Sequence, residues 1–145
     1  MVIKREKISY LFLHRMENVM TRRLSQFRYE ANSWKRILEF IRQENIQTKN
    51  HLAEVVRFSE AENYFLNDVE YLINKLLQIE TAITLITKDI GYFERFLEKE
   101  FYVDGTSKNI TATRHSVIKD IRNLENEFKN IKYEVDSFLN NTILS

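Results

Sequence analysis

The stretch FLNDVEYLINKLLQIETAITLITKDIGYFERFL, residues 65–97, decides the fold. Its apolar residues recur about every 3.5 residues, a repeat that keeps one side of a helix facing its neighbour as the two supercoil. Further apolar residues beside this stripe, such as Ile73 and Leu85, make it wider than the contact line of a two-stranded coiled coil. The pattern predicts a long helix that packs against at least two others. The apolar residues of the stripe recur at alternating steps of four and three: Phe65, Val69, Leu72, Leu76, Ile79, Ile83, Ile86, Ile90, Phe93 and Leu97.

Both ends of this helix carry local signals. Residues 59–62, with the sequence SEAE, match a capping box and predict the start of the helix. Residues 102–108 collect Asp-Gly and small polar residues, and they predict the turn where the chain reverses. Gly91 lies between these signals, and we expect the helix to pass through it. A kink or a close approach of another helix would explain a glycine at this position.

Two further segments repeat the pattern on either side of the central stretch. After the turn, a second long helix is expected over about residues 109–140. Before the capping box, Asn45 and Thr48 occupy stripe positions between Ile41 and Leu52, where a polar residue lowers stability but fixes register or partner number. We predict an all-α fold, an antiparallel three-helix, coiled-coil-like bundle of long helices formed by residues 29–145. The defining apolar residues of the two flanking helices are Trp34, Ile37, Leu38, Ile41, Leu52, Val55, Val117, Ile121, Leu124, Phe128, Ile131, Val135 and Phe138.

Composition supports helices and narrows the class of protein. The 145 residues include no proline, no cysteine and two glycines, so turns are few and disulfides and thiolate metal sites are excluded. Hydrophobic residues make up 43 % and charged residues 30 %, which is typical of a folded domain. No apolar run reaches the length of a membrane span, and the first residues do not resemble a secretory signal. We therefore expect a cytoplasmic protein.

The first 28 residues form a separate, basic segment. They contain seven basic and two acidic residues, a net charge of +5, whereas the whole chain has a net charge of +1. Residues 4–28 show a weaker amphipathic helical pattern, which predicts an N-terminal helical extension. Whether this helix continues into the helix of Trp34 or folds back as a fourth element stays open. Its apolar positions are Ile8, Leu11, Phe12, Met16, Val19, Met20, Leu24 and Phe27.

No pattern in the chain indicates an enzyme, a cofactor or a metal. Di-iron bundles use Glu-x-x-His pairs, and the chain has only the reversed spacing, at His14 and Glu17 and at His51 and Glu54. No further histidine or patterned carboxylate completes a ligand shell. A glycine-rich phosphate loop and a serine nucleophile motif are also missing from the sequence. We expect a non-enzymatic protein without a small-molecule substrate.

The basic N-terminal helix is the best candidate for a functional surface. We expect it to bind a protein partner or a second copy of the chain, because helix-in-groove association uses apolar and charged residues of this kind. Two alternatives stay open: phosphate contacts to a nucleic acid through the arginines, and a membrane surface bound through Leu11 and Phe12. The candidate residues are Leu11, Phe12, Arg15, Arg22, Arg23 and Arg28.

Overall fold

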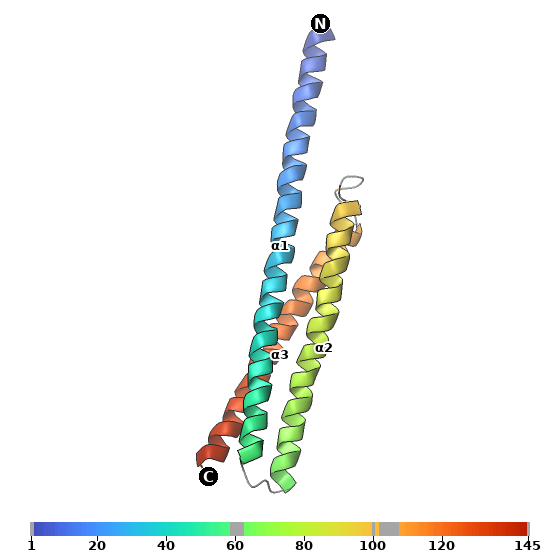
Figure 1. The fold of residues 1–145 in the computed structure, drawn as a ribbon. Helices are drawn as coiled ribbons and strands as arrows, with labels where there is room; N and C mark the ends of the chain where they lie inside the picture. The colour runs from blue at the N-terminus through green and yellow to red at the C-terminus, as the bar shows by residue number, and fades with distance from the viewer. Residues whose placement is uncertain (1, 59–62, 100, 102–107, 145) are drawn as a thin grey trace.

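The computed structural model describes residues 2–58, 63–99, 101 and 108–144, with side chains for 7–57, 66–99, 101 and 108–142. These residues form three helices: α1 (Val2–Phe58), α2 (Asn63–Lys99) and α3 (Lys108–Leu144). The chain runs down α1, up α2 and down α3 again, and each helix packs on the other two (Figure 1). The predicted all-α, antiparallel three-helix bundle is confirmed.

The apolar stripes predicted from the sequence form the core. Leu76 and Leu124 are 0 % and 2 % exposed, and Ile83 and Ile131 are 6 % and 7 % exposed. The predicted stripe of residues 65–97 is buried throughout α2 from Val69 onward. A seven-residue repeat therefore places these side chains inward along the whole bundle, as supercoiled helices require. The buried residues that α3 contributes are Ile110, Val117, Ile121, Leu124, Phe128, Ile131, Val135 and Leu139.

The N-terminal extension is part of α1. Helix α1 has 57 residues and runs without interruption through residue 28, whereas α2 has 37 residues. At a rise of 1.5 Å per residue, α1 is longer than α2 by about 30 Å. Its N-terminal end projects beyond the rest of the molecule (Figure 1). Of the two arrangements left open by the sequence, the structure has the continuous helix, because nothing in residues 4–58 breaks helical periodicity.

Helix α2 passes through Gly91, as expected. A Cβ atom built at Gly91 would meet no heavy atom within 4 Å outside its own surroundings. A close helix approach at Gly91, one of the two explanations considered for this residue, is therefore wrong. The predicted capping box at residues 59–62 lies outside the described residues, and so do residues 102–107 of the predicted turn at 102–108, whose last residue, Lys108, begins α3.

Helix α1 uses opposite charges toward its two neighbours. Its lysines face α2, with Lys35 Nζ 2.8 Å from Glu94 and Lys49 Nζ 2.6 Å from Glu80. Two of its carboxylates face α3: Glu44 lies 2.9 Å from Lys132 Nζ, and Glu30 accepts two hydrogen bonds from the Arg114 guanidinium at 2.7 Å. The hydrogen bonds with Glu30 raise the pKa of Arg114 above its usual value. Flanking charges of this kind select neighbours and register more than they add stability.

Candidate functional site

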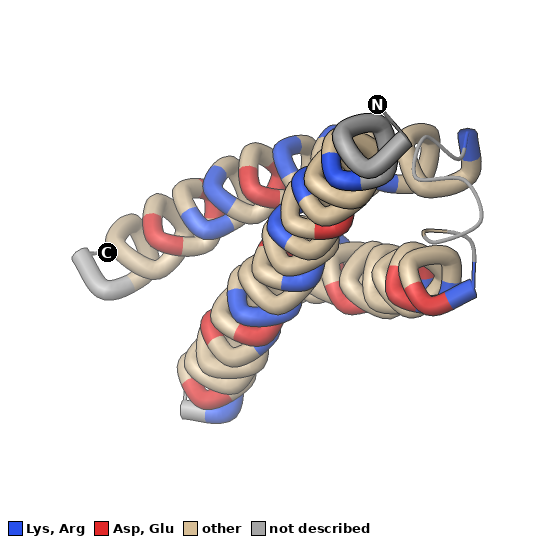
Figure 2. The backbone as a smooth tube through the Cα atoms, turned by 90° about the horizontal axis from the view of Figure 1, so that it is seen from above, with Lys and Arg blue, Asp and Glu red and all other residues tan. Residues whose placement is uncertain are grey.

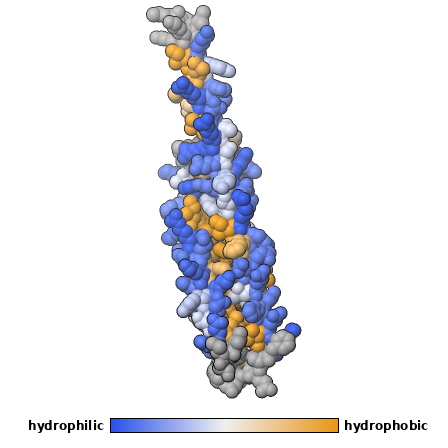
Figure 3. Space-filling view, turned by 90° about the vertical axis from the view of Figure 1, so that its left-hand side faces the viewer, coloured by the Kyte–Doolittle hydropathy of each residue, from blue (hydrophilic) through white to orange (hydrophobic). Residues whose placement is uncertain are grey.

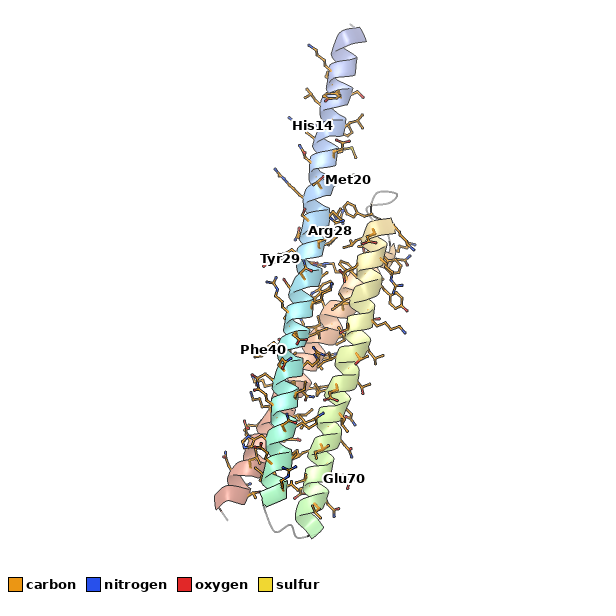
Figure 4. The ribbon with its side chains drawn as sticks, in the orientation of Figure 1. His14, Met20, Arg28, Tyr29, Phe40 and Glu70 are labelled. Carbon is orange, nitrogen blue, oxygen red and sulfur yellow. The ribbon has the colours of Figure 1, made fainter. Side chains whose placement is uncertain are left out.

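The candidate surface is the projecting segment of α1, which we define as residues 7–23. Every side chain from residue 7 to residue 19 is exposed, Met20 is half-buried and Leu24 is only 4 % exposed. Packing against α2 and α3 thus begins near Met20, which lies just above the end of α2, while His14 lies higher on the projecting segment (Figure 4). The segment has helical backbone but makes little contact with the rest of the fold.

Large apolar side chains of the projecting segment lie in solvent. Ile8 is 67 % exposed, Phe12 is 62 % exposed and Val19 is 63 % exposed. Tyr10, Leu11, Leu13 and Met16 are also exposed, and hydrophobic atoms gather on this part of the surface (Figure 3). Covering one such side chain contributes about 1.5–3 kcal/mol. Several large apolar side chains exposed on one short segment are typical of a binding site.

The apolar side chains occupy two sides of the helix. At about 100° per residue, Ile8, Phe12 and Val19 fall within about 40° of one another. Leu13 and Met20 lie about 110° further round, on the side that continues the buried positions of α1. A helix that is apolar on two sides fits between two other helices rather than against one flat surface.

The structure brings some of the predicted partner-binding residues together and separates others. Leu11, Phe12, Arg15 and Arg22 fall within a sector of about 100°, so they share one side of the helix. Arg28 lies on roughly the opposite side, at the level of the end of α2 (Figure 4). All of these side chains are exposed. The charged residues of the N-terminal part of α1 are mostly basic, as Figure 2 shows.

Arg23 differs from the other arginines because it contacts the bundle. Its guanidinium carbon lies 5.6 Å from the ring centroid of Phe27, within the range of a cation–π interaction. Phe27 in turn makes edge-to-face contacts with Phe93 and Phe101, at centroid distances of 5.9 and 6.3 Å. Arg23 therefore covers the aromatic cluster that closes the upper end of the bundle.

Asn45 and Thr48, the two predicted specificity residues, lie where the sequence placed them. Asn45 is 0 % exposed, its Nδ2 donates to the Leu76 carbonyl oxygen at 3.0 Å, and its Oδ1 has no hydrogen-bond partner. The hydroxyl of Thr48 donates to the carbonyl oxygen of Glu44 at 2.8 Å within α1, so it is satisfied locally. Of these two residues, only Asn45 forms a polar contact between helices. Their role in register stays a prediction.

One feature of the site was missed in the sequence, although the signal is there. Along α1, basic residues recur at every seventh position except one, in a line that we call the cationic row: Lys7, His14, Thr21, Arg28, Lys35, Arg42 and Lys49. In the bundle, Lys35 and Lys49 of this row form ion pairs with carboxylates of α2, whereas Arg42 between them pairs with Glu39 of α1. The sequence does not indicate which helix lies beside this row, whereas the ion pairs in the structure show that it is α2.

The rest of the described surface includes an apolar groove. A groove of about 380 Å³ between α1 and α3 is lined mostly by apolar side chains, and Phe40 in it is 64 % exposed. In the described part of the chain, no group of three or more His, Asp or Glu residues could hold a metal ion. No helix over the described ranges is both long and apolar enough to cross a membrane. The cytoplasmic location stays a prediction. The groove is lined by Arg36, Ile37, Phe40, Ile41, Glu125 and Phe128.

Comparisons with protein families, curated proteins and solved structures found no match to this chain.

Proposed function

We propose that this protein is a non-enzymatic interaction module that binds a protein partner through the projecting segment of α1. The observation that carries the proposal is the exposure of the large apolar residues on residues 7–19, of which Phe12 is 62 % exposed. Isolated helices of this length are marginal in water, so most of their stability comes from packing an amphipathic face. A partner that covers Ile8, Phe12 and Val19 supplies that packing.

The bundle supports this role by holding the segment at a fixed angle. Helix α1 is anchored in the core from Leu24 through Leu52, which is 0 % exposed. Growth of a helix from an existing helical end avoids the unfavourable nucleation step. The projecting segment is thus presented to a partner with much of its ordering already complete, which favours binding.

A matched pair of variants tests the proposal. Leu11→Ser combined with Phe12→Ser removes two exposed apolar side chains from the segment, which are 59 % and 62 % exposed. Phe40→Ser combined with Leu85→Ser removes two of similar exposure, 64 % and 60 %, from the bundle. Affinity purification with the full chain is expected to recover a partner that is lost only with the first variant. Equal recovery with both variants, or no recovered protein with a strictly monomeric chain in light scattering, would contradict the proposal.

A membrane surface is the second candidate, favoured by Arg15 and Arg22 at the edge of the sector that contains Ile8, Phe12 and Val19. Interfacial helices combine an apolar face with basic residues in this way. This function predicts that the chain co-sediments with anionic vesicles and that Leu11→Ser with Phe12→Ser abolishes the effect. Absence of the wild-type chain from the vesicle pellet would exclude it.

A further inference from the structure

The cationic row of α1 continues beyond the end of α2, the helix with which Lys35 and Lys49 form ion pairs. Lys35 and Lys49 of the row form ion pairs with Glu94 and Glu80 of α2. Between these two pairs, α1 advances by fourteen residues while α2 recedes by fourteen, which is two heptads of a regular antiparallel seam. The same register sets Arg28 opposite residue 101, beyond the end of α2 at Lys99. The remaining members, Lys7 and His14, therefore have no α2 residue opposite them.

The upper part of the row is unpaired in the described structure. Lys7, His14 and Arg28 form no ion pair with another described residue, and the His14 ring stacks on Tyr10 at a centroid distance of 6.4 Å. Beside them, Leu13 and Met20 continue the line of the buried Leu24 and the partly buried Phe27 within about 60°. The projecting segment thus continues both the apolar side chains and the cationic row with which α1 contacts α2.

A second copy of the segment does not fit this surface. Residues 7–23 contain four lysine and arginine residues, Lys7, Arg15, Arg22 and Arg23, but only one carboxylate, Glu17. In a parallel or an antiparallel pair of two such segments, cationic rows would meet cationic or neutral residues. Like charges along a helical seam are destabilising and oppose pairing. The missing carboxylates must come from a different helix.

We propose that the projecting segment binds an acidic amphipathic helix of another polypeptide, antiparallel to α1 and end to end with α2. This inference rests on the proposed function and names the chemistry of the partner. Carboxylates at heptad spacing lie opposite His14 and Lys7, as Glu94 and Glu80 lie opposite Lys35 and Lys49, and the end of the partner next to Phe101 brings a further carboxylate to Arg28. Exposed ion pairs contribute about 0.2–1 kcal/mol each, so the apolar contacts supply affinity and the row selects charge and direction.

Glu17 adds a further element of selectivity. It lies seven residues before Leu24, at a position that faces the neighbouring helix in the heptad pattern of α1. A basic or amide side chain fits opposite it, whereas a carboxylate would be repelled. The expected partner is therefore acidic at its edge but not along its apolar line.

The test uses the full chain and two synthetic peptide probes of about 28 residues, each with leucine at the two seam positions of every heptad. One probe has glutamate at all flanking positions, and the other has lysine there, so that neither pairs with itself. The row variant combines Lys7→Glu with Arg28→Glu. The matched control combines Lys88→Glu with Lys119→Glu, which reverses two exposed lysines of the bundle and changes the net charge equally. Binding is measured by fluorescence anisotropy of the labelled probes.

The expected result is that the wild-type chain prefers the glutamate probe. The row variant is expected to bind the glutamate probe about tenfold more weakly and the lysine probe more tightly, whereas the control stays within about twofold of wild type. Equal binding of both probes, if it depends on Leu13 and Met20, would overturn the acidic partner but leave the proposed function intact. Binding of neither probe, or binding of anionic vesicles or single-stranded RNA alone, would overturn both.

Discussion

Replacing Asn45 with leucine is expected to raise the free energy of unfolding by about 1 kcal/mol. Asn45 is 0 % exposed, and its Oδ1 lies in the core without a hydrogen-bond partner. An unpaired buried polar atom costs about 1–3 kcal/mol, whereas the single bond from Nδ2 to the Leu76 carbonyl contributes about 0.5–1.5 kcal/mol. Leucine has the same number of side-chain heavy atoms and the same branching as asparagine, so it fills the site without a cavity.

The assay is urea unfolding monitored by far-UV circular dichroism. The slope of the unfolding free energy against urea concentration is compared between variants to verify that the transition is the same. In thermal unfolding, the gain corresponds to about 2–4 °C in Tm. Asn45→Ala is the control. It removes the same unpaired oxygen but leaves a cavity, so its free energy of unfolding is expected to rise little or not at all. A lower urea midpoint for Asn45→Leu would refute the reasoning, because it would mean that the bond to Leu76 outweighs the unpaired oxygen. Light scattering on the same variant checks whether the polar layer also fixes the number of chains.

The remaining predictions concern the helices and their ion pairs, and urea unfolding measures each of them. Gly91→Ala raises the free energy of unfolding by about 1 kcal/mol, because alanine favours the helix and its Cβ meets no neighbouring atom; a loss would indicate a kink that needs glycine. Leu76→Ala lowers it by about 2–5 kcal/mol, whereas Leu85→Ala, at a site 60 % exposed, changes it by less than about 0.5 kcal/mol. Glu30→Gln, which weakens the pair with Arg114, lowers it by less than about 1 kcal/mol, and the loss shrinks in high salt. A salt-independent loss would show that the pair acts by packing instead.

The heptad pattern made most of the fold predictable. Steps of four and three along residues 69–97 identified side chains that are all buried in α2, because period and burial are linked by helix geometry alone. The same logic identified Asn45 and Thr48 as stripe positions. The pattern did not show that Asn45 leaves one oxygen unpaired, because that depends on how far α2 lies from α1.

The projecting segment was predicted only in part. Its composition identified a basic amphipathic helix, but helix propensity is equally satisfied by a continuous rod and by a helix that folds back. The difference lies in tertiary contacts: Arg23 covers Phe27 at the end of the bundle, and nothing in the described structure packs over Phe12. The cationic row was readable from the sequence, yet its meaning depends on the partners of Lys35 and Lys49.

The most direct test of the account is one distance within α1, which decides whether its N-terminal end projects as a rod. Ser9 and Gln47 are both exposed, and the chain has no cysteine, so cysteines at these two positions can carry spin labels without interference. A continuous helix separates the two Cα atoms by about 57 Å, at 1.5 Å per residue. A helix that folds back near residue 28 would bring them to about 10 Å, the spacing of packed helices. Pulsed electron paramagnetic resonance on the diluted, doubly labelled chain is predicted to give the long distance, and a dominant short distance would contradict the account.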